Sequence, residues 1–323
     1  MKQTRGKHKM LAIIGKILLS ILAIIIVLVI VLFLRGKWKS SQPFLKPGYA
    51  ASYHTDAALE AKYLGMGPHP VSSEEYDAQD EKIIQYKVWY PTGLERSSRI
   101  WPMVLIVNAS DTNATRYEPF FEHLASWGFI VVGNEDRMTG TGASCGVTMD
   151  KMLELNEQDS LLHGKIDVNN IGIAGFSQGG AGAINAVIDE THGHWYKTLF
   201  TGSAANSTLS EAIGWAYDAS KVSIPWFMDA GTLKGDTGEN GGIGVAPLSS
   251  LIENFDAAAD GVLKVRARAV GADHEDMLIR SDGYLVAWML FQLQGDQEAA
   301  QAFVGDHPEL MNNARWQDVM ISE

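Results

Sequence analysis

The chain begins with a long apolar run that differs from everything after it. Residues 17–34 contain no charged side chain, and Ser20 is their only polar residue. At about 1.5 Å per residue these 18 residues nearly cross a hydrocarbon core of about 30 Å, and residues 11–15 can complete the span. The pattern predicts a transmembrane helix.

A cleaved signal peptide is the alternative interpretation of this run. Its apolar region is usually shorter, about 7–15 residues, and is followed by a small-residue cleavage site. Here the basic segment 35–38 follows instead, which favours an uncleaved anchor. Basic residues on the two flanks nearly balance, and we expect the N-terminus in the cytoplasm and the domain outside.

Beyond the apolar run, strand and helix patterns alternate. Strand patterns cover residues 82–90, 102–107, 128–133, 171–175, 197–202, 224–231 and 265–270. Helix patterns cover residues 117–124, 148–162, 178–189, 247–259 and 285–293. Such alternation predicts an α/β fold with a mainly parallel central sheet and helices on both faces. The polar, Pro-containing stretch after the anchor gives three expected parts: flank and anchor 1–36, tether 37–55 and domain 56–323.

Charge is distributed unevenly between these parts. Residues 1–46 hold nine of the 26 Lys and Arg residues and no acid, so the remainder has 17 basic and 38 acidic residues, a net charge of −21. This field disfavours nucleic acid as a partner and favours neutral or cationic substrates. Cys145 is the only cysteine, which excludes an intrachain disulfide.

The stretch "IGIAGFSQGGAG" places Ser177 between Gly175 and Gly179, where an apolar strand pattern gives way to a helix pattern. G-x-S-x-G in this context is typical of a nucleophile elbow. Its glycines are needed because a Cβ two residues from the strained serine would clash. The backbone N–H of Gln178 would then stabilise an oxyanion at the helix N-terminus.

A nucleophilic serine needs a base, and in the order Ser, acid, His the base follows the last strand pattern. Of nine histidines, His274 lies there, in "GADHEDM". The acid should follow the strand 224–231, and two residues compete. We prefer Asp236, which lies in the loop beyond the strand, over Asp229, which lies within it.

The second oxyanion donor is expected in the loop after the first buried strand, "VNASDTNAT", and we assign it to Ser110 with Ala109 as the alternative. His192, His194 and Asp189 could suggest a metal site, but a third group of ligands at a suitable spacing is missing from the sequence, and a solvated loop is the better interpretation. We therefore expect no metal and no cofactor.

Together, "GFSQGGAG", "LASWGFIVV" and "GADHEDM" resemble the dienelactone hydrolase-like group of α/β-hydrolases, which includes bacterial cutinase-type and chlorophyllase-like enzymes. The resemblance covers residues 82–293 and implies an α/β-hydrolase fold and a cofactor-free serine esterase using Ser177, His274 and Asp236. Dienelactone hydrolases proper use Cys where this chain has Ser177, and cutinase-type enzymes usually have Gly and an aromatic residue where it has Ala109 and Ser110.

The expected function is therefore a membrane-anchored carboxylesterase for small or medium neutral esters. Three alternatives stay open: a peptidase, an acyltransferase, and a tethered scaffold or binding module without catalysis. The sequence does not indicate an oligomeric state.

Overall fold

The computed structural model describes residues 2–40, 42–239 and 243–322, with the backbone alone for residues 2–15, 37, 39 and 40. The chain divides into two compact units, Met1–Phe44 and Leu45–Glu323. The first unit contains the helix α1 (Lys2–Ser40). Its segment Lys16–Gly36 is long and apolar enough to cross a membrane, in agreement with the predicted span.

The second unit begins eleven residues earlier than the predicted domain boundary at residue 56. Leu45 and Tyr53 are buried, and the Tyr49 hydroxyl donates a hydrogen bond to the Asp282 carboxylate at 2.6 Å. Residues 45–55, which we call the strap, therefore pack on the domain. The tether is therefore shorter than predicted. The sequence pattern did not indicate this, because the few large side chains of the strap are dispersed among polar residues and proline.

One nine-stranded sheet forms the centre of the described part of this unit, in the order β1-β2-β4-β3-β5-β6-β7-β8-β9. The strands are β1 (Val71–Asp77), β2 (Gln85–Pro91), β3 (Trp101–Val107), β4 (Ile130–Asn134), β5 (Ile166–Phe176), β6 (Tyr196–Gly202), β7 (Trp226–Gly231), β8 (Lys264–Ala269) and β9 (Trp316–Ser322). Strands β3 to β8 are parallel, whereas β1, β2 and β9 join by antiparallel pairing. The predicted α/β class with a mainly parallel sheet is confirmed.

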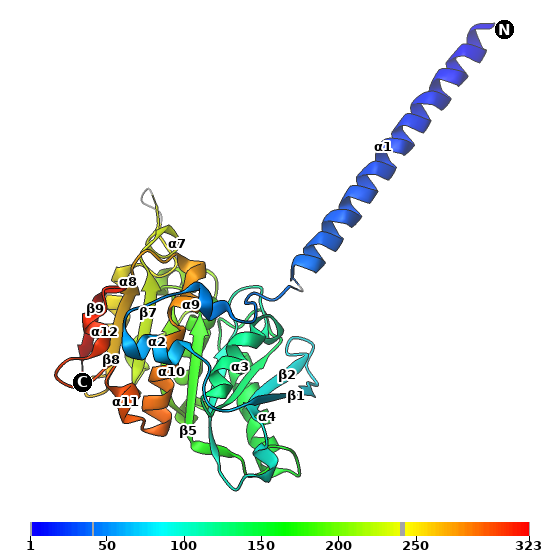
Figure 1. Ribbon diagram of the computed structural model, residues 1–323. Coiled ribbons are helices and arrows are strands. Elements are labelled where there is room, and N and C mark those ends of the chain that lie inside the picture. The colour runs from blue at the N-terminus through cyan, green and yellow to red at the C-terminus, as the bar shows by residue number, and fades with distance from the viewer. Residues whose placement is uncertain (1, 41, 240–242, 323) are drawn as a thin grey trace. The chain divides into compact units, whose positions relative to one another are not determined.

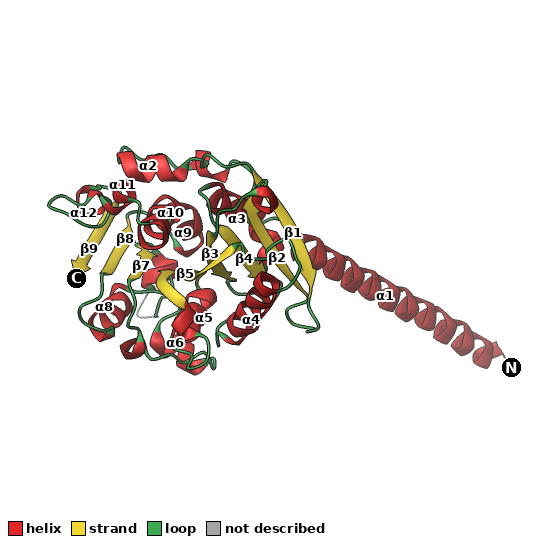
Figure 2. Ribbon diagram, turned by 90° about the horizontal axis from the view of Figure 1, so that it is seen from below, coloured by secondary structure: helices red, strands yellow, loops and turns green. Residues whose placement is uncertain are grey.

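Helices cover both faces of the sheet (Figure 2). They are α2 (Ala58–Leu64), α3 (Glu118–Ser126), α4 (Ala143–Glu157), α5 (Gln178–Val187), α6 (Ser207–Ala212), α7 (Lys234–Thr237), α8 (Leu248–Ala257), α9 (Met277–Arg280), α10 (Asp282–Met289), α11 (Gln297–Ala300) and α12 (Glu309–Asn312), with a π-helical turn at Leu290–Gln294. In Figure 2, α2, α3 and α10 lie on one side and α4, α5, α6 and α8 on the other. The short helix α7 lies beyond the carboxyl ends of the parallel strands (Figure 1).

Strand β3 shows how the sequence produces this layering. All seven of its residues are buried, as its continuous apolar run predicts for a strand covered on both faces. Val104 and Ile106 join the core under α3 and α10, while Met103 and Leu105 join the core under α4 and α5. Alternate side chains thus fill two separate cores, and the sheet between them holds its carboxyl edge rigid.

Candidate active site

Ser177 lies in the sharp turn between β5 and α5. Its backbone has φ 56° and ψ −122°, a left-handed conformation that a non-glycine residue rarely adopts. The turn is held because the Ser177 N–H donates to the carbonyl of Gly202 at 3.0 Å and its own carbonyl accepts from Gly180 and Ala205. The hydroxyl is thereby presented at the carboxyl edge of the sheet, as the elbow motif predicts.

The flanking glycines are sterically required. A Cβ at Gly175 would lie 2.0 Å from the carbonyl oxygen of Gly179, and a Cβ at Gly179 would lie 2.2 Å from the carbonyl oxygen of Val107. No side chain fits at those distances. The N-terminus of α5 can therefore pack directly against the end of β3.

The structure brings Ser177, His274 and Asp236 together. His274 Nε2 lies 2.9 Å from Ser177 Oγ, and His274 Nδ1 lies 2.7 Å from Asp236 Oδ1. A carboxylate only accepts hydrogen bonds, so Nδ1 carries the proton and Nε2 is free to accept from the serine hydroxyl. This is the arrangement in which an imidazole removes a serine proton.

Asp236 is fully buried and its second oxygen is also bound. Oδ2 accepts hydrogen bonds from the Ser203 hydroxyl and the Gly231 N–H, both at 2.6 Å. Ser203 has φ 44°, a second strained serine next to the site. We did not identify Ser203 from the sequence, because nothing but its position after a strand pattern marks it.

His274 is positioned by the residue before it. Asp273 accepts hydrogen bonds from the N–H groups of His274 (2.9 Å) and Gly235 (2.7 Å), and its own N–H donates to Asp276. The bond from the His274 backbone lowers the pKa of Asp273 below its usual value. Asp273 thus ties the segment that carries His274 to α7, the short helix that holds Asp236 where the sequence predicted a loop.

Asp229, the alternative acid, does not contact His274. It lies within β7, is 1% exposed, and its carboxyl oxygens have no hydrogen-bond partner among the described residues. Burial raises the pKa of Asp229 well above its usual value, and the nearby Ser281 hydroxyl offsets this only in part. The carboxylate that reaches the imidazole is that of Asp236, so the geometry favours Asp236 as the acid.

Ser110 and Gln178, the predicted oxyanion residues, lie side by side. The Ser110 hydroxyl donates to Gln178 Oε1 at 3.5 Å, and the Gln178 amide donates to the carbonyl of Arg137 at 3.0 Å. As the first residue of α5, Gln178 has a backbone N–H without an acceptor in its own helix. The loop of Ala109 and Ser110 and the helix terminus therefore meet at the nucleophile.

Two other places were candidates for a site. The ring of His192 lies between Asp189 (2.9 Å) and Asp150 (3.1 Å), and His194 is not part of this cluster. Across the part of the chain that the structure describes, no group of three His, Cys, Asp or Glu residues is placed to hold a metal ion.

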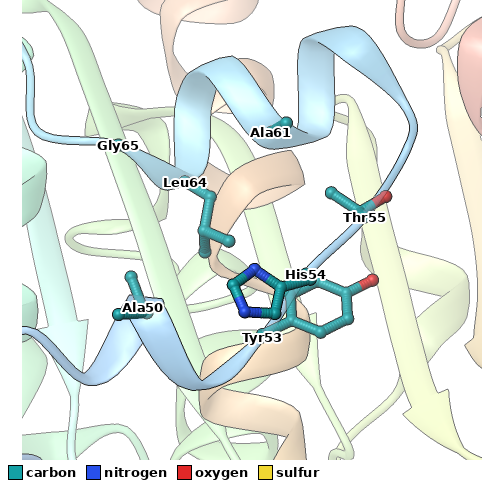
Figure 3. A pocket seen from close by; sticks show the side chains of 8 residues that line it. Ala50, Tyr53, His54, Thr55, Ala61, Leu64 and Gly65 are labelled. Carbon is teal, nitrogen blue, oxygen red and sulfur yellow. The ribbon is translucent and has the colours of Figure 1, made fainter.

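A shallow hollow of about 300 Å³ lies between the strap and α2 and includes His54 (Figure 3), but none of the predicted site residues line it.

Comparison with known proteins adds no relative. No protein-family model matches the chain, and no curated protein matches its sequence.

Proposed function

We propose that the chain is a serine carboxylic-ester hydrolase. The observation that carries the proposal is the continuous hydrogen-bonded line from Ser177 through His274 to a buried Asp236. Triads of this geometry activate serine in several unrelated folds. A strained serine whose hydroxyl meets an imidazole is difficult to explain as a purely structural feature.

The fold supports an assignment to the α/β-hydrolases. The nucleophile follows β5, the acid follows β7 and the histidine follows β8, so that the three residues occur in the chain order of that fold. All three lie at the carboxyl edge of the parallel strands, where open α/β sheets bind ligands. We infer an α/β-hydrolase fold of the dienelactone hydrolase-like group on this basis and on the sequence resemblance.

The proposed reaction proceeds in two steps. Ser177 Oγ attacks the ester carbonyl carbon while its proton passes to His274 Nε2, and the Gln178 and Ser110 N–H groups stabilise the oxyanion. The alcohol leaves with the proton from His274, which gives an acyl-enzyme. Water then attacks the acyl carbon and yields its proton to His274, and the acid departs as the proton returns to Ser177.

We further propose that α1 anchors the enzyme in a membrane, with the N-terminus in the cytoplasm and the catalytic unit outside. The support for the anchor is the apolar segment Lys16–Gly36, which basic residues flank on both sides. The acidic catalytic unit favours small or medium neutral esters over anionic ones.

Hydrolysis of short-chain p-nitrophenyl esters by the full chain in a neutral detergent tests the proposal. We expect activity that falls at least about a thousandfold in both Ser177→Ala and His274→Ala. Full activity in Ser177→Ala, or an inactive but folded wild-type protein, would contradict it and favour a scaffold. Aminoacyl naphthylamides distinguish a peptidase, and product analysis with added glycerol distinguishes an acyltransferase.

A further inference from the structure

Three large apolar side chains are exposed on segments that neighbour the candidate site in the chain. Met138, Leu233 and Ile243 expose 63%, 45% and 70% of their surface. Met138 lies in the loop after β4 and follows Arg137, whose carbonyl accepts the hydrogen bond from the Gln178 amide. Single exposed apolar residues are normal, but a group of them at the rim of a site indicates contact with apolar material.

The other two residues lie within two positions of glycines that pack against triad residues. Leu233 lies two residues before Gly235, where an added Cβ would lie 2.8 Å from the Cβ of His274. Ile243 precedes Gly244, where an added Cβ would lie 2.0 Å from the backbone oxygen of the triad aspartate. The three residues, which we call the apolar rim, therefore belong to chain segments that contact Gln178 on one side of the site and His274 and Asp236 on the other.

The chain also enters the catalytic unit at this edge of the sheet. The N–H of Leu45 donates to the carbonyl of Arg116, which lies in a short helical turn after β3. Only residues 37–44 separate Leu45 from Gly36, the end of the apolar segment. Fully extended, eight residues reach about 29 Å at most, which limits the distance between the attachment point at Leu45 and the end of the apolar segment.

The charges around the histidine select among lipid surfaces. Asp273, Glu275 and Asp276 are sequence neighbours of His274, and the basic residue Lys234 begins the adjacent helix α7. Acidic side chains repel anionic headgroups and do not oppose uncharged or zwitterionic ones.

We propose that the apolar rim contacts the bilayer that anchors the chain and that the substrate is an uncharged lipid ester, such as an acylglycerol, taken from that bilayer. The proposal rests on the esterase function proposed above. An apolar rim loses its hydration on contact with acyl chains, and this burial of apolar surface favours the contact.

The test uses the full chain reconstituted in phosphatidylcholine vesicles that contain diacylglycerol. The measured quantity is the rate of diacylglycerol hydrolysis divided by the rate for dissolved p-nitrophenyl acetate. The double variant Leu233→Ser/Ile243→Ser should lower this ratio roughly fivefold or more, because it weakens burial in the lipid. The matched control is Met311→Ser/Met320→Ser, which changes two exposed apolar residues of α12 and β9, 53% and 44% exposed, away from the rim.

An equal ratio in the wild type and both double variants would overturn the lipid proposal while leaving the esterase in place. Vesicles of phosphatidylglycerol should slow diacylglycerol hydrolysis, and equal or faster hydrolysis there would overturn the preference for an uncharged surface. Failure to hydrolyse the dissolved acetate, together with no fluorophosphonate labelling of Ser177, would overturn the esterase function itself and this inference with it.

Discussion

At the residue scale, the acid of the candidate triad depends on a side chain that no motif marks. The Ser203 hydroxyl donates a hydrogen bond to Asp236 Oδ2, and His274 Nδ1 is hydrogen-bonded to Oδ1, so each carboxylate oxygen has a partner. The carboxylate cannot rotate without breaking one of these bonds. Ser203 is therefore a positioning residue for the imidazole.

Ser203→Ala should lower kcat about tenfold and leave KM nearly unchanged, because a hydrogen bond to a charged group is lost without any contact to the substrate. Steady-state kinetics with a p-nitrophenyl ester measures both constants. Ser126→Ala is the matched control, since Ser126 is also fully buried and hydrogen-bonded but lies on α3. An unchanged kcat in Ser203→Ala, or an equal loss in the control, would refute the positioning role.

Asp229 should make the protein less stable as the pH rises. Burial raises the pKa of its carboxyl in the folded protein, so the folded state keeps a proton that the unfolded state releases above about pH 4. The free energy of unfolding then falls with pH, by at most about 1.4 kcal/mol per pH unit for one proton, until the folded pKa is passed.

Asp229→Asn replaces this ionisable carboxyl with an amide that does not titrate. The free energy of unfolding of the variant, relative to that of the wild type, should therefore increase from pH 5 to pH 8. Urea unfolding followed by tryptophan fluorescence at each pH measures the slope. The exposed Asp159→Asn is the control and should leave the slope unchanged. Parallel slopes in Asp229→Asn and the wild type would show that Asp229 is ionised in the folded state.

The sequence pointed to Ser177 and His274 because each comes soon after an apolar strand pattern, and it left Asp236 and Asp229 as competing acids; the structure places Asp236, not Asp229, beside His274. Ser203 and Asp273 were not predicted as positioning residues, since their roles depend on partners 33 and 38 residues away. Such pairings arise only when parallel strands bring their carboxyl ends together.

At the element scale, the nucleophile depends on how closely α5 approaches β3. The contact is backbone to backbone, because Gly179 leaves no room for a Cβ beside the carbonyl of Val107. The strand and helix patterns indicated both elements but not the distance between them.

Gly179→Ala should displace the start of α5, destabilise the protein by about 1–3 kcal/mol and reduce kcat by more than a hundredfold. Thermal unfolding and ester hydrolysis measure the two effects. Gly65→Ala is the matched control, because its Cβ would meet only the Lys62 carbonyl at 3.3 Å. Wild-type activity in Gly179→Ala would mean that the turn does not need this close approach.

The elements that the sequence did not predict are those without a clear alternation of apolar and polar residues. Strand β1 is nearly all polar and half exposed, and it is held by antiparallel pairing to β2. Strand β9, at the other edge of the sheet, pairs with β8 in the same manner. Edge strands derive their conformation from hydrogen bonds to a neighbour, which a single-chain hydrophobic pattern does not encode.

The helix predicted at residues 148–162 is instead α4, which begins and ends five residues earlier.

At the scale of the whole molecule, the negative charge of residues 47–323 should select between charged substrates. An ester with a cationic acyl group should have a higher kcat/KM than an anionic analogue at about 10 mM salt, because long-range attraction raises its local concentration. At about 500 mM salt the ratio should shrink about tenfold towards one, since ions screen the field. A ratio independent of salt would show that the field does not reach the site.

The central claim is that Ser177 forms an acyl-enzyme with His274 as its base. Rapid mixing of the full chain with p-nitrophenyl acetate, followed by acid quenching and mass analysis of the peptides, tests it most directly. The account predicts a burst of p-nitrophenol that matches an acetyl group on Ser177, and the loss of both in His274→Ala. An acetyl group on another residue, or turnover without any acetyl group on Ser177, would contradict it.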